Sequence, residues 1–494
     1  MEKLFNTDWN LLLQLALPMV LLAGLGMSLL LCSAFFPRDR PKIFLGVLLL
    51  AILGILFYTW MQWRVVVPLS QEMLLFDRFS YSLDLIVLVT LLIVLLLCSK
   101  YVSAEGTRSS EVYALFLFAV VGMMLIHHGA DLIVIFLGIE IMSLSSYILT
   151  GSRRGIIRSY EAAMKYFILG SFASCFLLYG IALAYGVTGS TSLASLQSLS
   201  LAADTSGNTV LLTMSVAFLL VGLGFKIAAV PFHLWAPDVY EGAPTPVTAF
   251  MAAGVKTAAF AALLRIVLAL GHLPQIPWIP VLWILSALTM TIGNLVALRQ
   301  THIKRLLAYS SVAHAGYLLV GVTAALQNNT LSDATLGGVV FYLFAYSLMT
   351  LGAFGVVVAM GHRGEQVEEL SDFSGLSQRH PFLAAALTVF LLSMAGIPAT
   401  IGFAGKFYLF AGAVEAGFYG LTILAVLNSV ISVYYYFAPI IKMYFQPPRG
   451  YELPPLSYPL LAAVFLCLFT VLYLGIFPSD LFLMARESVK ELIF

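Results

Sequence analysis

Long runs of hydrophobic residues, separated by short polar segments, follow one another along the whole chain of 494 residues. A helix needs roughly 20 mostly apolar residues to cross the hydrocarbon core of a bilayer. The runs therefore predict about fourteen membrane-spanning helices. The predicted spans are 10–36, 43–62, 80–100, 111–128, 131–151, 159–187, 209–232, 245–270, 276–298, 303–324, 333–361, 381–412, 418–444 and 457–478. The first run lacks the charged start and the cleavage site of a removable signal, so it is interpreted as a helix.

Composition agrees with this pattern. Hydrophobic residues make up 61% of the chain and charged residues only 10%, and the mean hydropathy is +0.98. Such values exclude a soluble domain of this length. We therefore predict an all-α polytopic membrane protein. The net charge of +1 gives no indication of nucleic-acid binding.

The basic residues in the loops and at the ends of the apolar runs predict an orientation, because lysine and arginine concentrate on the cytoplasmic side. One set of alternating loops carries Arg38, Arg40, Lys42, Lys100, Arg108, Arg153, Arg154, Arg158, Arg299, Lys304, Arg305, Arg363, Arg379, Lys442 and Arg449. The opposite set carries only Lys3, Arg64, Arg78, Arg486 and Lys490. Both termini are therefore expected on the outer side of the membrane.

Basic residues also lie inside the apolar runs, namely Lys165, Lys226, Lys256, Arg265 and Lys406. A lysine or arginine at the centre of a membrane helix costs about 2.5 to 3.5 kcal/mol on insertion scales. A series of them implies hydrated cavities or charge partners, which is typical of a proton path. Since guanidinium keeps its proton in proteins, Arg265 is expected to act electrostatically or to snorkel toward the surface.

Two predicted helices contain proline close to a lysine. Lys226 precedes Pro231 in segment seven, and Lys406 follows Pro398 in segment twelve. Proline frees backbone groups that protein or water must satisfy, so both helices are expected to be discontinuous, although incidental kinks are the alternative. Breaks at matching places are typical of inverted repeats. We predict helices 1–3 in residues 1–110, five-helix repeats in 111–270 (helices 4–8) and 276–446 (helices 9–13), and helix 14 with a short tail in 447–494.

Glu140 is expected near mid-membrane in segment five, as the only carboxylate placed so deeply. Burial favours release of a lysine's proton and a nearby carboxylate favours its retention, so a Glu140–lysine pair could act as a switch. A static ion pair that only joins helices is the alternative. Glu161, four residues before Lys165, is expected to pair with it at an entrance or anchor.

Histidine titrates near neutral pH, which makes His314 in segment ten a candidate relay, although a satisfied core histidine is the alternative. His233 and the pair His127–His128 are weaker candidates. Among the connections, residues 63–79 predict an external β-hairpin and 188–208 an ordinary external loop. The proline-rich segment after Trp235 predicts a connector whose acidic residues, Asp238 and Glu241, have no compensating lysine.

Several site classes have no sequence signature here. The four cysteines are scattered singly, so no iron–sulfur cluster is predicted. The chain has no Gly-rich nucleotide motif of either common type and no spaced metal ligands. We therefore predict neither a cofactor site nor a metal site.

Five segments carry a resemblance to a known family: GFKIAAVPFHLWAPDVYEGAPTPV, IKRLLAYSSVAHAGYLLVG, LGIEIMSLSSYIL, AAMKYFILGS and MAGIPATIGFAGKF. They resemble the antiporter-like subunits of proton-translocating NADH–quinone oxidoreductase, respiratory complex I. The resemblance is strongest over residues 111–446. Within the family, the chain is most similar to members that lack a long lateral helix and have a lysine, here Lys406, in segment twelve.

The resemblance implies roles for matching positions. It implies proton translocation through Glu140, Lys165, Lys226, Lys256, His314 and Lys406, from the cytoplasm to the outer side. It further implies a multi-pass subunit of the bacterial inner membrane, among other complex I membrane subunits. NADH, FMN, iron–sulfur clusters and quinone are then expected in partner subunits, with quinone reduction there driving the transport.

Two other functions are compatible with the same residues. One is a subunit of a multisubunit sodium/proton antiporter, although sodium prefers several oxygen ligands and the chain offers mainly lysines. The other is a structural subunit of the same complex whose charges hold the assembly together without pumping.

Overall fold

The computed structural model describes residues 9–492 except 36–39, 67–68, 72, 105–107, 200–205, 272, 274–275, 328–331, 362–367, 449–455 and 491. Lys3, Arg38, Arg363 and Arg449, used above for orientation, lie outside the described residues, as does the side chain of Lys100.

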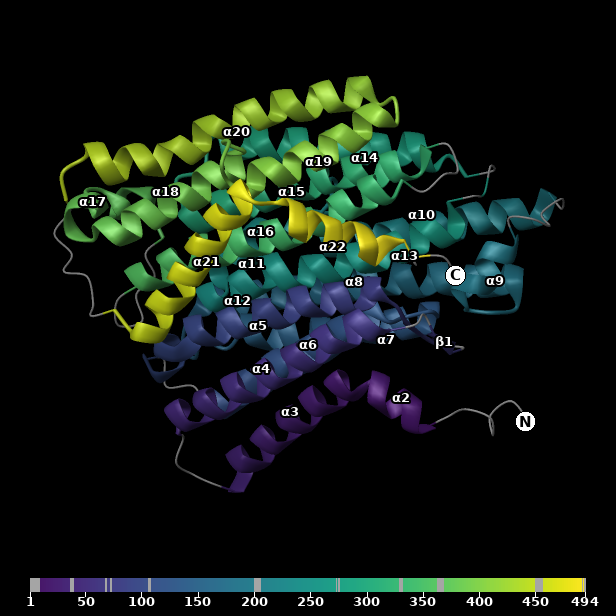
Figure 1. Ribbon diagram of the computed structural model, residues 1–494, viewed down its shortest axis with the longest axis horizontal. Helices are drawn as coiled ribbons and strands as arrows, with labels where there is room; N and C mark the ends of the chain where they lie inside the picture. Colours follow the sequence, from purple (N-terminus) through teal and green to yellow (C-terminus); the bar gives the residue numbers. More distant parts are fainter. Residues whose placement is uncertain are drawn as a thin grey trace.

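The described chain is almost entirely helical (Figure 1). In the N-terminal half the helices are α2 (Trp9–Leu15), α3 (Leu17–Phe35), α4 (Pro41–Val65), α5 (Arg78–Ala104), α6 (Ser109–His127), α7 (Leu132–Thr150), α8 (Ile157–Thr188), α9 (Leu193–Leu199), α10 (Ser206–Ile227) and α11 (Trp235–Gly242). Next come α12 (Thr245–Phe250), the π-helix η1 (Met251–Val255), α13 (Lys256–Leu270), α14 (Trp278–Ala297), α15 (Ile303–Ala325) and α16 (Asp333–Met360). The last are η3 (Leu370–Phe373), α17 (Leu376–Arg379), α18 (Pro381–Ala395), α19 (Ile401–Glu415), α20 (Tyr419–Phe445), α21 (Tyr458–Ile476) and α22 (Ser479–Val489).

The prediction of an all-α bundle of membrane-spanning helices is confirmed. Among the described residues, 13 helical stretches are long and apolar enough to cross a membrane. The predicted twelfth segment is not one of them, because it consists of two helices of 15 residues each, α18 and α19. The other predicted segments each correspond to one of the 13 stretches.

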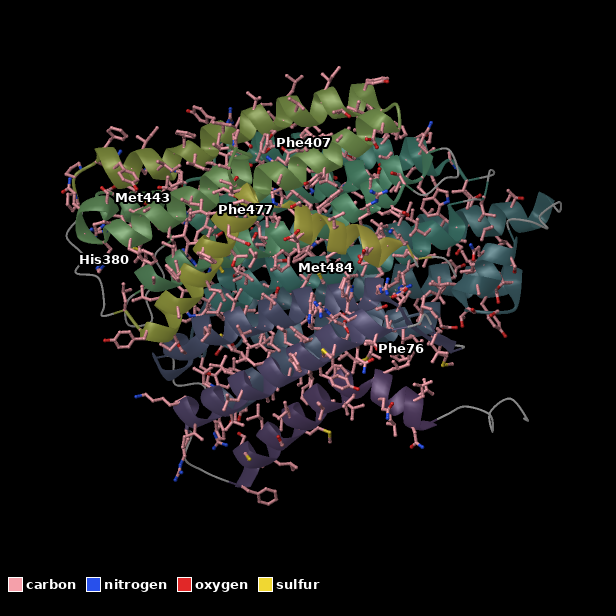
Figure 2. The ribbon with its side chains drawn as sticks, viewed as in Figure 1. Phe76, His380, Phe407, Met443, Phe477 and Met484 are labelled. Carbon is pink, nitrogen blue, oxygen red and sulfur yellow. The ribbon has the colours of Figure 1, made fainter. Side chains whose placement is uncertain are left out.

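The most buried helices lie in the middle of the bundle. Over an 18-residue window, 100% of the α12–η1–α13 span and 94% of α15 and of α16 are buried, against 28% of α4 and of α21. The helices α3 and α4 lie at one edge of the bundle and α20 at the opposite edge (Figure 1). Phe407 and Phe477, labelled in Figure 2, are each 58% exposed on the outside. An apolar exterior around a core that holds lysine and histidine suits a bundle surrounded by lipid.

Both predicted helix breaks are present. The first separates α10 from α11, and the second separates α18 from α19. Each contains an alanine in the left-handed region, Ala228 with φ 57° and Ala399 with φ 64°. Left-handed backbone costs a non-glycine residue roughly 1–2 kcal/mol, so tertiary packing must hold both breaks in place.

The connections partly differ from expectation. The predicted hairpin is present as β1 (Leu69–Gln71) and β2 (Leu74–Phe76), antiparallel with Ser70 opposite Leu75. The expected loop at 188–208 instead contains α9, because Leu193 and Leu196 lie one turn apart and both are buried. The proline-rich segment after Trp235 was predicted to be a connector, and it contains the short helix α11 and the start of α12. Pro237 lies in the first turn of α11, and Pro244 and Pro246 lie at the N-cap and in the first turn of α12, where the missing N–H costs little.

Candidate functional site

Lys226 lies in the last turn of α10, directly before the first helix break. It is 3% exposed. Its Nζ donates to Ser143 Oγ at 2.7 Å and to Tyr147 Oη at 3.4 Å, both on α7. The break ends α10 at this point, so the ammonium reaches α7 at the level where the backbone of its own helix stops.

Glu140 lies one helical turn before Ser143 on α7 but faces a different neighbour. Its carboxylate accepts a hydrogen bond from Ser174 on α8. In the described part of the chain, Glu140 and Lys226 form no ion pair, although the carboxylate acts on the ammonium electrostatically. Glu140 is only partly buried, so it lies toward the outside of the bundle.

Lys256 begins α13, immediately after the π-helix η1. A π-helical turn inserts an extra residue into a helix and often occurs at functional sites. The side chain is 2% exposed, and its Nζ donates to the hydroxyl and the backbone carbonyl of Ser311 on α15. The ammonium also lies 5.0 Å from the ring centroid of Tyr346 on α16.

His314, on α15, contacts a tyrosine through each ring nitrogen. Nδ1 is 2.6 Å from Tyr342 Oη, and Nε2 is 3.0 Å from Tyr436 Oη. Tyr436 also shares a hydrogen bond with Ser310. The imidazole is 1% exposed. Because a tyrosine hydroxyl both donates and accepts, this environment suits either imidazole tautomer.

Lys406, on α19, bridges the second helix break. Its Nζ donates to the carbonyl oxygen of Ala395, the last residue of α18, at 3.0 Å. It also donates to Ser429 Oγ on α20 at 2.8 Å. The carbonyl freed by the break is thus satisfied by the buried lysine, as expected for irregular backbone at membrane depth.

The central residues form a continuous buried series. Tyr346 lies against both Lys256 and His314, with its ring centroid 5.0 Å from the imidazole. Tyr317 lies between His314, at 5.6 Å, and Lys406, at 4.8 Å. The structure therefore brings together three of the residues predicted from sequence, Lys256, His314 and Lys406.

Lys226 is linked to this series by an aromatic cluster. Tyr147 packs edge-on against Tyr166, which stacks on Trp235 at 4.6 Å. Tyr240, on the same short helix as Trp235, interacts with the Ser311 side chain that binds Lys256. The Tyr166 hydroxyl is buried and has no hydrogen-bond partner among the described residues. A buried hydroxyl of this kind is the sort of group that internal water satisfies.

Lys165 lies apart from the buried series, in a partly exposed ionic cluster. Its Nζ is 2.7 Å from Glu161 and 3.0 Å from Asp238. The expected Glu161 pair is confirmed, whereas the expectation that Asp238 has no compensating lysine is wrong. Arg305 pairs with Asp238 at 2.9 Å and with Glu241 at 2.7 Å. The mistake arose because Lys165 and Arg305 approach α11 from other helices.

This cluster surrounds a pocket and favours the ionised form of Asp238. The pocket lining includes Arg158, Glu161, Lys165 and Asp238. Burial opposes ionisation of Asp238, but its hydrogen bonds from Lys165 and Arg305 prevail and lower the pKa of its carboxyl.

Arg265 does not snorkel, which corrects one of the two predicted possibilities. It is fully buried, with Nη2 3.1 Å from both carboxylate oxygens of Asp77 and Nε 2.9 Å from the His127 carbonyl oxygen. His127 and His128 are also buried and contact opposite oxygens of Asp84, at 2.7 and 2.9 Å. These groups join the hairpin to α5, α6 and α13. Asp77 and Asp84 add buried carboxylates that sequence reasoning did not single out.

Sequence reasoning also missed most of the neutral partners. They are Ser143, Tyr147, Tyr166, Ser174, Tyr240, Tyr342, Tyr346, Ser429 and Tyr436. One signal was available, because Ser143 and Tyr147 lie three and seven residues after Glu140, on the same face of one helix. His233 lies in the first helix break and is buried.

Comparisons with known proteins agree on one family. A family profile described as "NADH:quinone oxidoreductase/Mrp antiporter, TM" matches residues 129–432. NADH-quinone oxidoreductase subunit N of Trichlorobacter lovleyi is 45% identical over 479 residues, which is 97% of each chain. A chain of respiratory complex I from Thermus thermophilus is 34% identical with a TM-score of 0.79, covering 95% of this chain and 99% of that one. A chain of the Mrp complex from Dietzia shares the fold, with a TM-score of 0.84 at 22% identity over 97% of each chain.

Proposed function

Because the chain belongs to the antiporter-like membrane subunits of proton-translocating NADH–quinone oxidoreductase, of the subunit N type, we propose that its buried series carries the protons. Protons are taken up near Glu140 and Lys226, pass Lys256 and His314, and leave by Lys406. The membership makes the chain a proton-translocating part of an enzyme complex that lies among other membrane subunits.

The observation that carries this proposal is the unbroken contact from Lys256 through Tyr346, His314 and Tyr317 to Lys406. These side chains come from α13, α15, α16 and α19, of which the first three are the most buried elements described. Titratable groups collected in the most buried part of a bundle need a reason to be there, since they are costly to bury. Proton transfer supplies that reason.

The partners of the lysines suit groups that change protonation state. Lys226, Lys256 and Lys406 each contact a serine hydroxyl. A hydroxyl accepts a hydrogen bond from an ammonium and can donate one to a neutral amine, whereas a carboxylate favours only the ammonium. Each lysine can therefore release and regain a proton without leaving a buried group unsatisfied.

We place the uptake side at the ionic cluster around Lys165. The cluster is partly exposed and its pocket is lined by charged side chains, as an entrance for ions requires. Its position fits the predicted orientation, with the cluster on the cytoplasmic side and both termini outside. On the same basis we assign the chain to the bacterial inner membrane. NADH, FMN, iron–sulfur clusters and quinone are assigned to partner subunits.

The decisive experiment is Lys226→Ala in the intact complex, with the exposed Lys490→Ala as the matched control. The complex should assemble in normal amount, while proton uptake by membrane vesicles and quinone-coupled NADH oxidation fall by about tenfold or more, a barrier increase of about 1.4 kcal/mol. Equal losses of assembly and of turnover would support a purely structural subunit instead. Proton movement that requires sodium would support an antiporter.

A further inference from the structure

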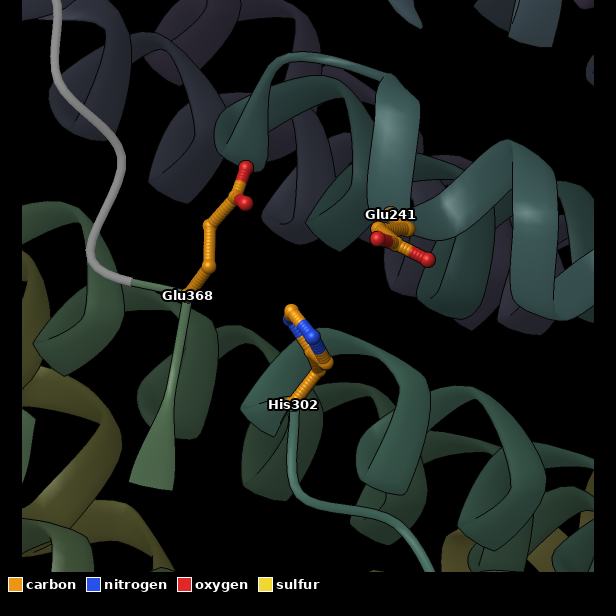
Figure 3. Close-up of side chains that lie close together, drawn as sticks. All are labelled: Glu241, His302 and Glu368. Atoms are coloured by element: carbon orange, nitrogen blue, oxygen red, sulfur yellow. The ribbon is translucent and has the colours of Figure 1, made fainter. Parts of the chain in front are cut away.

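Three potential metal ligands meet where the predicted first and second five-helix repeats come together. Glu241 lies in α11 of the first repeat. His302 caps the start of α15, and Glu368 lies just before η3, both in the second repeat. One ligand atom from each lies within 4.8 Å of the others. Figure 3 shows the imidazole of His302 with a carboxylate on either side. The three residues have no motif spacing, so the sequence did not reveal them.

The backbone holds this arrangement in place. Ile303 N–H donates to the Glu368 carbonyl oxygen at 2.8 Å, and Leu370 N–H donates to the Thr301 carbonyl oxygen at 2.8 Å. These bonds hold Glu368 beside His302. On the other side, Lys304 Nζ donates to the carbonyl oxygens of Glu241 and Ala243 at 2.6 and 2.7 Å. The end of α11 is thereby fastened to the start of α15.

The side chains retain atoms that can bind an ion. His302 Nδ1 is buried and has no hydrogen-bond partner in the part of the chain that the structure describes. Arg305 binds Glu241 through Oε2, and Arg158 binds Glu368 through Oε2. Each carboxylate has a second oxygen, Oε1, that could bind an ion, while the arginine holds the other oxygen. Oriented ligands bind a metal more tightly than free ones.

We propose that Glu241, His302 and Glu368 form a zinc-binding site that bridges the two repeats. Imidazole nitrogen and carboxylate oxygen are both zinc ligands, and a water would complete the tetrahedron. Magnesium and calcium prefer oxygen ligands alone and are poorly matched. Zinc bonds of about 2.1 Å place two ligands about 3.4 Å apart, so ligand atoms that are now up to 4.8 Å apart must approach one another by up to about 1.4 Å. Small rotations of the two glutamates supply this movement.

The test measures zinc bound to the purified intact complex by equilibrium dialysis, with zinc ions alone as the probe. His302→Ala should bind one zinc fewer per complex than the unmodified protein. The matched control is His380→Ala, another partly buried histidine before a helix, and it should bind the full amount. Magnesium at the same concentration should leave zinc binding unchanged.

Glu368→Gln provides an independent variant if His302→Ala assembles poorly. It preserves shape and should weaken zinc binding at this site by about tenfold or more. Equal zinc content and affinity in all variants would overturn the proposal, as would equal losses in His302→Ala and His380→Ala. The experiment measures zinc binding, so its result is independent of whether the chain translocates protons.

Discussion

The buried pair of Arg265 and Asp77 gives the sharpest prediction about stability. Both side chains are fully buried. Among the described residues, replacing Arg265 by methionine leaves the Asp77 carboxylate with the Ser80 backbone N–H at 2.8 Å and the Ser80 hydroxyl at 2.5 Å. Removing one partner of a buried ion pair costs about 3–5 kcal/mol, because the other charge remains without its counter-ion.

The double variant Arg265→Met with Asp77→Asn separates charge from packing. The amide carries no charge and can still accept from Ser80, so the uncompensated charge disappears. The double variant should therefore be more stable than the single variant, although it has one more change. Replacing both members of a buried pair is often close to neutral.

The assay is the thermal midpoint of the purified chain in detergent, followed by tryptophan fluorescence. A loss of about 3–5 kcal/mol corresponds to a fall of several degrees in Tm. The exposed Arg154→Met is the control, since surface charges contribute at most about 1 kcal/mol. If Arg265→Met has the same Tm as the Arg154→Met control, the reasoning is refuted. It is also refuted if the Tm of the double variant is no higher than that of Arg265→Met.

The same perturbation tests how the site is positioned. Arg265 follows Lys256 by nine residues on α13, about 13 Å along the helix axis. The contacts of Arg265 hold its end of α13 against the hairpin and α6, and they thereby fix the position of Lys256 along the helix axis. Coupled turnover should therefore fall in Arg265→Met complexes that do assemble, and recover in part in the double variant.

Three further predictions concern packing, the relay histidine and pH. A Cβ at Gly122 would lie 2.6 Å from a backbone atom of α7, so Gly122→Ala should cost about 1–3 kcal/mol in thermal unfolding, whereas Gly46→Ala, in open space, should not. Tyr342→Phe removes the 2.6 Å bond to His314 and leaves a buried nitrogen unpaired, at about 1–3 kcal/mol, so proton uptake by vesicles should fall about fivefold or more with normal assembly. The ion pairs of Asp238 lower the pKa of its carboxyl, so its contribution to stability is present at neutral pH and is lost below about pH 4. Between pH 6 and 3, Tm should therefore fall less in Asp238→Asn than in the unmodified protein. An equal fall of Tm in the two proteins would contradict this.

Membrane topology could be predicted because it depends on local properties. Each apolar run is long enough to span a bilayer, and each proline near Lys226 or Lys406 removes a backbone hydrogen bond wherever the helix packs. The hairpin at 63–79 was likewise predicted from local signals. The loop at 188–208 was not, because α9 depends on burying Leu193 and Leu196 against other segments.

The candidate site also combines residues that local sequence identified with contacts that only the tertiary structure shows. A charge in an apolar run identified Lys256 and Lys406, and a lone histidine identified His314. The position of Tyr317 three residues after His314 was a local signal, but nothing local indicated that Tyr346 would contact both Lys256 and His314. Nor did local sequence show that Asp238 has two cationic partners, because Lys165 and Arg305 are distant along the chain.

The sequence by itself therefore determined that this is a bundle of membrane helices with titratable groups inside it, because hydropathy and burial cost are properties of each residue and its near neighbours. Tertiary structure alone decided which hydroxyl meets each lysine, that Arg265 is buried against Asp77, and that Glu241, His302 and Glu368 meet. Those contacts join residues far apart in the chain, and only the packing of whole helices brings them within hydrogen-bonding distance.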